Sequence, residues 1–229
     1  VAFNRAFQEL GFPVQWGPQE HHGLLRVAGG KERLRAYVHD VGFGVPVAEA
    51  EEESLIARLH ARKTDLFLQL LESGTLPLRP GVKRFMDEVM SLGMVLGVCS
   101  TSNERSVRAV TEGMLGSVRF DLVLAGDAVK SKKPDPEIYL LALERMGLRP
   151  RECVVIEDSQ IGVTAAKRAG TFVVATTNPY TQEEDLTMAD LVVTCLGDPT
   201  GERGVLVRGG AGLVFDGVLS AGRLAEYFG

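Results

Sequence analysis

The chain has 229 residues, of which 45% are hydrophobic and 24% charged, and its net charge is −5 at pH 7. This length suffices for a core domain and a small accessory domain, and the composition is typical of a soluble globular protein. The negative charge argues against nucleic acid or an anionic membrane as a partner, and no apolar run reaches the roughly eighteen residues of a membrane span. Three cysteines without metal or redox spacing favour a reducing compartment.

The first third of the sequence predicts only helices. Apolar residues recur at helical spacing in the ranges 1–10, 19–28, 31–41 and 48–71, the last as one long helix or a helix pair. A Pro-rich stretch, Leu76–Gly81, then predicts a hinge. We therefore expect a helical cap domain over residues 1–74.

After the hinge the pattern changes to alternating strands and helices. This order predicts an α/β fold with a doubly wound parallel sheet, over residues 75–229. The expected strands are 94–99, 121–125, 153–156, 171–175 and 191–194, and the expected helices are 82–92, 103–115, 136–146 and 160–169.

Two carboxylates, Glu157 and Asp158, follow the apolar strand 153–156, and Ser159 is placed to cap the next helix. Ligands of open α/β sheets bind at the carboxyl ends of the strands, and adjacent carboxylates there are hard oxygen ligands suited to Mg²⁺. The alternative is a solvated acidic turn.

Small hydroxyl and amide residues follow an earlier strand in the same way. Ser100 lies at the tip of strand 94–99, and Thr101, Ser102 and Asn103 turn into the following helix. Hydroxyls and free backbone N–H groups at a helix start can cradle a phosphate. An ordinary helix cap without a ligand is the alternative.

Two lysines precede a third helix start. Lys132 and Lys133 stand before Pro134, with Asp135 as the expected N-cap. A lysine fixed beside a phosphate acts as a point charge. The alternative is a solvent-exposed basic turn.

With Ser100, then Lys133, then Glu157–Asp158 in this order, the chain resembles the haloacid dehalogenase (HAD) superfamily of phosphohydrolases. The resemblance implies that an Asp attacks phosphorus, and that water hydrolyses the resulting aspartyl-phosphate. It implies Mg²⁺ as cofactor, bound by Asp158 with Glu157 beside it. Ser100 would hydrogen-bond a phosphoryl oxygen, and Lys133 would neutralise its charge.

The first motif of that superfamily, Asp-x-Asp-Gly on an early strand, is not found in this sequence. We expect that about twenty residues before Val1 carry it, roughly the length of one strand and loop. The motif supplies the nucleophile, the general acid and a central strand of the sheet. Residues 1–229 alone are therefore expected to be inactive and poorly folded, although the parent protein is an enzyme.

Two segments of the helical part, Ala28–Arg33 and Leu59–Phe67, are candidates for binding the substrate. Lys31 and Arg33 follow a Gly-Gly loop at a helix start, which can hold a second anion or can be a turn with solvated charges. His60 on a helix is more often structural than functional.

Together with the core sequences STSNERSV and KKPDPEIY, these two segments resemble the CbbY group of xylulose-1,5-bisphosphate phosphatases. The resemblance is strongest to the plant and algal members of that group. The resemblance implies a phosphorylated sugar as partner and a plastid location, the chloroplast stroma; a monomer is expected. It carries substrate contacts onto Gly29, Gly30, Lys31, Glu32, Arg33, His60, Ala61, Arg62, Lys63, Ser100, Thr101, Ser102, Asn103, Glu104, Arg105 and Ser106.

A bisphosphate accounts for this layout, because Lys133, Ser100 and Mg²⁺ hold the reacting phosphate while Lys31 and Arg33 hold the distal one. A sugar phosphomutase similar to β-phosphoglucomutase handles a bisphosphate too, so it stays an alternative. A protein that binds a sugar phosphate without catalysis is the third hypothesis.

Overall fold

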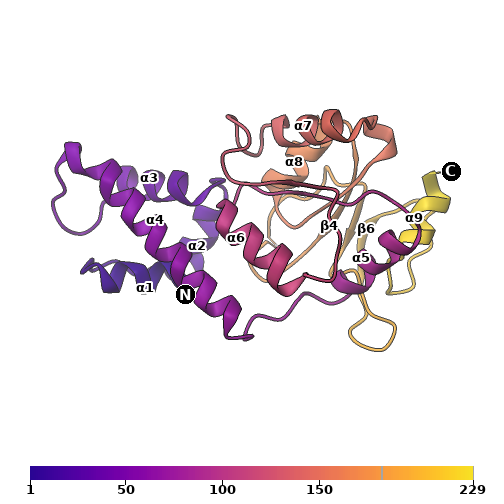
Figure 1. Cartoon of the computed structure of the whole chain (residues 1–229), viewed down its shortest axis with the longest axis horizontal. Helices are drawn as coiled ribbons and strands as arrows, with labels where there is room; N and C mark the ends of the chain where they lie inside the picture. The colour runs from indigo at the N-terminus through magenta and orange to yellow at the C-terminus, as the bar shows by residue number, and fades with distance from the viewer. Residues whose placement is uncertain (182, 229) are drawn as a thin grey trace.

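The computed structural model describes residues 1–181 and 183–228. Its first part is the helical segment α1–α4, which Figure 1 shows to one side of the strands. The bounds are Ala2–Glu9 for α1, Pro18–Leu25 for α2, Gly30–Asp40 for α3 and Glu49–Glu72 for α4. The expected helices are all present, and the long one is a single helix of 24 residues.

Aromatic residues form the centre of the helical segment. Trp16, the one tryptophan of the chain, is 5% exposed, and its ring lies 4.6 Å from that of Phe3 and 5.1 Å from that of Phe7. Tyr37 of α3 meets the same ring edge-on. Leu34, Ile56 and further apolar side chains complete a cluster drawn only from this segment. The helices therefore have a hydrophobic core of their own.

The second part alternates strands and helices, as the sequence predicts. Its elements are α5 (Val82–Ser91), β1 (Gly97–Cys99), α6 (Glu104–Arg108), the π-helix η1 (Ala109–Met114), β2 (Leu122–Leu124), α7 (Glu137–Met146), the 3₁₀ helix η2 (Pro150–Glu152), β3 (Val154–Glu157), α8 (Gln160–Arg168), β4 (Phe172–Thr176), β5 (Leu191–Val193), β6 (Leu206–Gly209) and α9 (Ala221–Phe228). The strand β6 and the helix α9 were not predicted.

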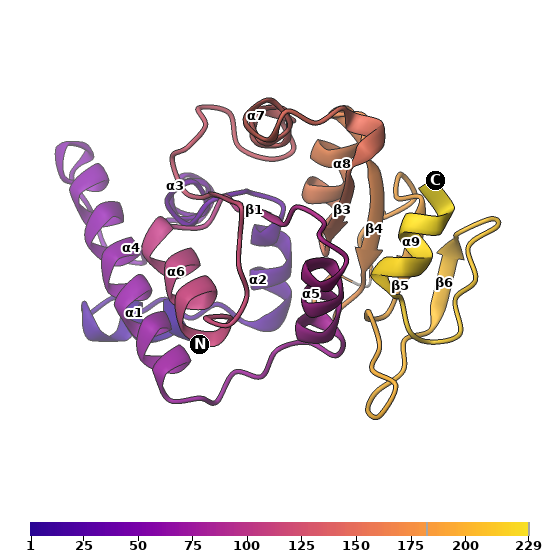
Figure 2. The same ribbon diagram turned by 45° about the vertical axis from the view of Figure 1, so that its right-hand side comes forward.

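The strands form two sheets instead of the single sheet that the pattern predicts. Parallel strands β1 and β2 make one sheet, and the other has the order β3-β4-β5-β6, with β6 antiparallel. The strands β1 and β3 are not hydrogen-bonded to each other. Figure 2 shows β1 apart from the β3–β6 group. Each of these two strands consequently has one edge without a strand partner among the described residues.

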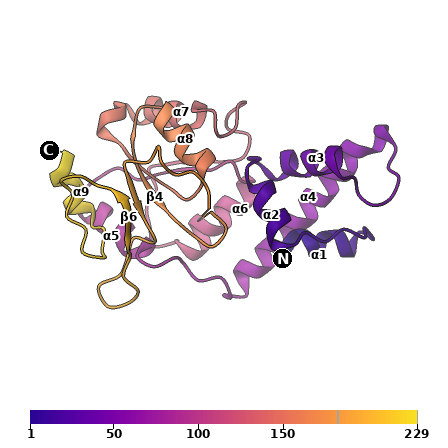
Figure 3. The ribbon, with the colours of Figure 1, turned by 180° about the vertical axis from the view of Figure 1, so that it is seen from behind.

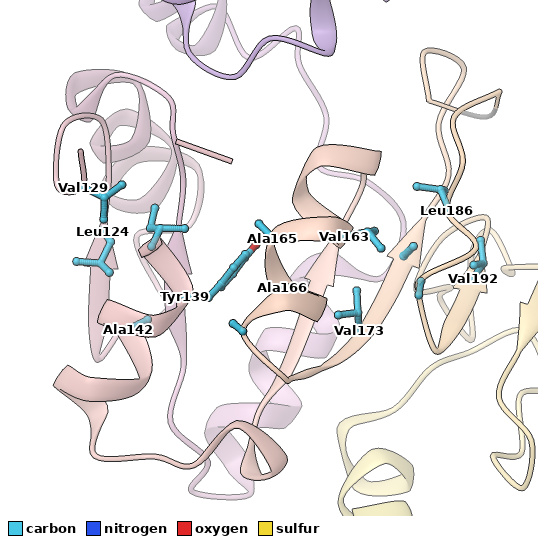
Figure 4. Packing of buried hydrophobic residues seen from close by; sticks show 14 residues of the cluster. Leu124, Val129, Tyr139, Ala142, Val163, Ala165, Ala166, Val173, Leu186 and Val192 are labelled. Carbon is cyan, nitrogen blue, oxygen red and sulfur yellow. The ribbon is translucent and has the colours of Figure 1, made fainter. Parts of the chain in front are cut away.

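Helices cover both faces of the four-stranded sheet. On one face, α8 packs against β3 and β4, while α7 contacts α8 and the strands β1 and β2; these elements share the cluster of Figure 4, which includes Ile138, Val163 and Val173. On the other, α5 and α9 pack with Phe85, Val174 and other residues, and both helices lie beside the β6 end of the sheet in Figure 3. Val173 and Val174 point to opposite faces because side chains alternate along a strand. This sandwich explains why β4 is apolar from Phe172 to Ala175.

Candidate functional site

A cleft of about 440 Å³ lies where the helical segment meets the carboxyl ends of the parallel strands. The cap, which is the helical segment α1–α4, contributes residues from all four helices and from the Gly-Gly turn before α3. The core contributes Arg79, the loops after β1, β3 and β4, and Lys133 before α7. Of the predicted site residues, it brings together Gly29, Gly30, Arg33, His60, Lys63, Ser100, Thr101, Ser102, Asn103, Lys133, Glu157 and Asp158.

Lys133 and Glu157 form a largely buried ion pair on the core side of the cleft. The Lys133 Nζ lies 2.5 Å from Glu157 Oε1, and the side chains are 9% and 10% exposed. Lys133 also donates to the carbonyl of Cys99 at 3.0 Å, and the Tyr139 hydroxyl donates to Glu157 Oε1. Lys133 thus reaches from the end of β1 to the end of β3, across the gap between the two sheets.

The start of α8 is shaped to accept Glu157. A Cβ at Gly162 would lie 1.9 Å from Glu157 Oε2, so only glycine leaves room for this carboxylate. The predicted cap is present, because Ser159 Oγ accepts a hydrogen bond from the Gly162 backbone N–H at 3.3 Å. Glu157 is therefore fixed from three sides by Lys133, Tyr139 and the helix.

Asp158 lies exposed on the same loop, with its Oδ2 3.4 Å from Asn178 Nδ2. Its pKa is raised, first by partial desolvation in the cleft and then by the charge of Glu157. Among the described residues no three His, Cys, Asp or Glu side chains come together as a metal site. Asp158 fits Mg²⁺ as one hard oxygen ligand, whereas the Oε1 of Glu157 is already held by Lys133 and Tyr139.

The loop after β1 presents hydroxyls to the cleft. Ser100 is anchored by its own N–H, which donates to the carbonyl of Leu124 at 2.9 Å, and its Oγ accepts from the Ser102 N–H at 3.2 Å. Asn103 caps α6 by accepting from the Arg105 N–H. The Ser100 hydroxyl proton has no fixed acceptor in these bonds and can be donated to a ligand.

Two partly buried cations, Arg33 and Lys63, occupy the cap side. The Arg33 guanidinium donates to the carbonyls of Leu24 and Val27, at 2.9 and 3.3 Å. Neither cation has a carboxylate within 4.0 Å in the described part of the chain. Burial lowers the pKa of both, and the charge of Arg33 lowers that of Lys63 further. Such a pair favours an anion between its members.

His60 is buried beside the Gly-Gly turn, where a Cβ on Gly30 would lie 2.6 Å from its ring. Burial, helped by the charges of Lys63 and Lys31, lowers its pKa to about 4. The ring is consequently neutral at pH 7.

A second, larger cavity of about 700 Å³ adjoins the first and shares Gly30, His60, Thr101 and Asn103 with it. Lys31, Glu32 and Glu104 lie in this cavity and not in the cleft with Lys133. The predicted catalytic residues Ser100, Lys133, Glu157 and Asp158 all line the smaller cleft. On the cap side of the smaller cleft the two cations are Arg33 and Lys63, whereas the exposed Lys31 lines the larger cavity. The contact of Lys31 with a substrate stays a prediction.

Four further predicted contact residues line neither cavity. Arg62 is bonded to Glu9 at 2.5 Å, and Arg105 lies 3.0 Å from Asp65. Ala61 is exposed, whereas Ser106 is buried with no partner for its hydroxyl in the described structure. Their contact with a substrate stays a prediction.

Sequence reasoning missed several residues of the cleft wall, among them Phe3, His21, Arg79, Asn178 and Tyr180. Arg79 lies in the Pro-rich hinge and donates to Thr176 Oγ1 at 2.7 Å and to the carbonyl of Thr194 at 2.9 Å. The signal available was that residues 177–181 follow β4 at the same edge of the sheet as Asp158.

Comparison with known proteins identifies relatives over most of the chain. The family model described as haloacid dehalogenase-like hydrolase matches residues 1–170. The CBBY-like protein of Arabidopsis thaliana is 46% identical over 207 residues, covering 89% of this chain. The chain spans 65% of the length of that plant relative.

Among solved structures, the crystal structure of CbbY from Rhodobacter sphaeroides in complex with phosphate has a TM-score of 0.77 and is 34% identical, with 85% of each chain covered. A mutant of the same protein, in complex with xylulose-(1,5)bisphosphate, matches equally well. The expected fold is therefore confirmed. None of the described helices is long and apolar enough to cross a membrane.

Proposed function

Because the chain belongs to the haloacid dehalogenase-like hydrolases, we propose that its cleft is the site of a phosphatase that acts on a sugar bisphosphate. Xylulose 1,5-bisphosphate is the substrate that we favour. The observation that carries the proposal is the presence of cations on both walls of one cleft, Lys133 on the core side and Arg33 with Lys63 on the cap side. A ligand with a phosphate at each end matches that charge pattern.

In this proposal the core side holds the phosphate that is removed. The Ser100 hydroxyl donates to a phosphoryl oxygen, and the ammonium of Lys133 balances the negative charge that develops during transfer. Glu157 keeps Lys133 in place. Asp158 would hold Mg²⁺, which when bound supplies further positive charge at the phosphoryl group.

The attacking carboxylate is not found among the cleft residues. Glu157 is bonded to Lys133 and Tyr139, and Asp158 is the residue that fits the metal. Among the described residues, β1 and β3 each have one edge without a strand partner, and Lys133 bridges the ends of these two strands, so we infer that a further parallel strand fits between them. We propose that the nucleophile comes from a segment outside these 229 residues, so the chain by itself releases no phosphate.

The test of this function is phosphate release from xylulose 1,5-bisphosphate with Mg²⁺, by a chain extended with a strand that carries Asp-x-Asp-Gly and by residues 1–229 alone. Activity in the extended chain only is the expected result. Turnover by residues 1–229 alone would show that the nucleophile lies within them. Formation of an isomerised sugar phosphate would indicate a mutase, and no turnover by either chain would favour binding without catalysis.

The cap cations are tested with Arg33→Met in the extended chain. We expect the KM for xylulose 1,5-bisphosphate to rise about 10- to 100-fold, since charged hydrogen bonds of a few kcal/mol are lost. A small monophosphate, which cannot reach the cap, should be hydrolysed almost normally. Arg35→Met is the matched control, because Arg35 lies two residues along α3 and is bonded to Glu53. Equal effects on both substrates would contradict a distal-phosphate role.

Location in the plastid is also a proposal, supported by the plant relative. Imaging of the fluorescently tagged parent protein in leaf cells tests it, and a signal outside plastids would refute it.

A further inference from the structure

Two adjacent lysines of the core serve opposite sides of the cleft. Lys133 points into the core, toward Glu157 and the end of β1. Lys132 instead reaches the cap, where its Nζ lies 3.2 Å from Glu32 Oε1, and it also lies 3.2 Å from Asp127 Oδ1 of the core. One ammonium group thus joins the two parts of the molecule one residue away from the predicted catalytic lysine.

Glu32, the cap partner of Lys132, packs against the Gly29–Gly30 turn. A Cβ on Gly29 would lie 2.0 Å from Glu32 Oε2 and 3.2 Å from the Cδ of Lys132. Gly29 adopts a φ of +91°, which favours glycine as well. The ring of His60 packs against Gly30, the next residue of the turn. The backbone that lines the cleft is therefore held between a salt bridge and a buried ring.

Other cap–core contacts are more open. Arg105 and Asp65 lie 3.0 Å apart with side chains 62% and 42% exposed, whereas Lys132 and Glu32 are 17% and 33% exposed. The rings of His21 and Tyr180 meet edge-on at 5.9 Å, and Tyr180 is half exposed. Exposed ion pairs are screened by water and salt, so the Lys132–Glu32 pair is the best placed of these contacts to fix the cap.

We propose that Lys132 is a positioning residue. It binds Glu32 and so holds the Gly29–Gly30 turn of the cap against the cleft while Lys133 faces the phosphoryl group. The role rests on the proposed function, because it concerns how the sugar phosphate is enclosed. Lys132 acts through Glu32 and does not touch the substrate in this proposal.

The position of the turn can be measured without any substrate. Hydrogen–deuterium exchange on the extended chain, followed in peptides that cover residues 28–33, should become about 3- to 10-fold faster in Lys132→Met and in Glu32→Gln. The double variant should be no faster than either single one, because both remove the same bridge. Lys132→Arg should restore slow exchange, and Lys83→Met, which breaks an exposed pair within α5, is the matched control.

Activity of the extended chain gives the second measurement. Lys132→Met should raise the KM for the bisphosphate about 5-fold and leave kcat for a small monophosphate unchanged. Unchanged exchange in the variants, or additive effects of the two single changes, would overturn the proposal. A weaker affinity of Lys132→Met for inorganic phosphate would also overturn it, since Lys132 would then bind the anion itself. If no chain shows turnover, the proposed function fails while the exchange result still decides the role of Lys132.

Discussion

The two walls of the cleft hold their charges in opposite ways. On the core wall, Lys133 is neutralised by Glu157 within the folded chain. On the cap wall, Arg33 and Lys63 face the cleft with no carboxylate within 4.0 Å among the described residues. The core wall is therefore rigid, because a paired cation is held in place before a ligand binds. The cap wall is suited to binding, because an unpaired cation is stabilised by a bound anion. Removing a cation should thus have opposite effects on stability on the two walls.

The largest effect is expected on the core wall. Lys133→Met leaves Glu157 buried without its cation, which should lower the free energy of unfolding by roughly 3–5 kcal/mol. In the extended chain it should also reduce kcat at least about 10³-fold. Urea unfolding and phosphate release measure the two effects. The double variant Lys133→Met/Glu157→Gln should recover much of the stability and none of the activity; no recovery would mean that the pair is not what stabilises this wall.

His60 provides a test of the positive cap wall through pH. Its pKa is about 4 in the folded chain, and about 6.5 in the unfolded chain, so the unfolded state binds the proton first. Stability should be unaffected above pH 6.5 and should fall as the pH drops toward 4, by up to about 3 kcal/mol.

The comparison is with His60→Gln, which cannot titrate. Urea unfolding at pH 7, 5.5 and 4 should show a steeper loss for the unchanged chain than for this variant. Identical slopes would show that His60 does not carry the acid sensitivity of the cap.

The smallest effect is expected for Lys63 and has the opposite sign. Its ammonium lies 5.4 Å from the centre of the Phe3 ring and 5.3 Å from that of Phe67, and burial and Arg33 both disfavour its charge. Lys63→Met keeps the chain length and removes the charge, so we expect it to raise the free energy of unfolding by about 1 kcal/mol. A clear loss of stability, seen by thermal or urea unfolding, would mean that the two aromatic rings stabilise the ammonium by more than its burial costs.

The sequence predicts the parts of this molecule that depend on local pattern. Helices α1 to α4 and the alternation of strands and helices follow from apolar periodicity. The places of Ser100 and Asp158 in the cleft follow from polar segments at strand ends, and that of Lys133 from a basic segment before a helix. The strand β6 was missed because all its residues are exposed and give no buried pattern.

Long-range contacts could not be predicted in the same way. Lys31 and Arg33 are two residues apart at one helix start, yet they line different cavities because side chains at i and i+2 lie about 200° apart around a helix. Lys63, from another helix, lines the same cleft as Arg33, and the role of Lys31 stays a prediction. Such a pairing depends on how α3 packs against α4, which no single segment specifies.

The lone tryptophan gives the molecule an optical property of its own. Trp16 lies inside the aromatic cluster of the helical segment, 6.3 Å from the ring of His21, which in turn meets Tyr180 of the core. Fluorescence of the indole ring will therefore report melting of the cap, while circular dichroism follows both parts. Two transitions at different urea concentrations would show that the cap and the α/β part unfold as separate cooperative units.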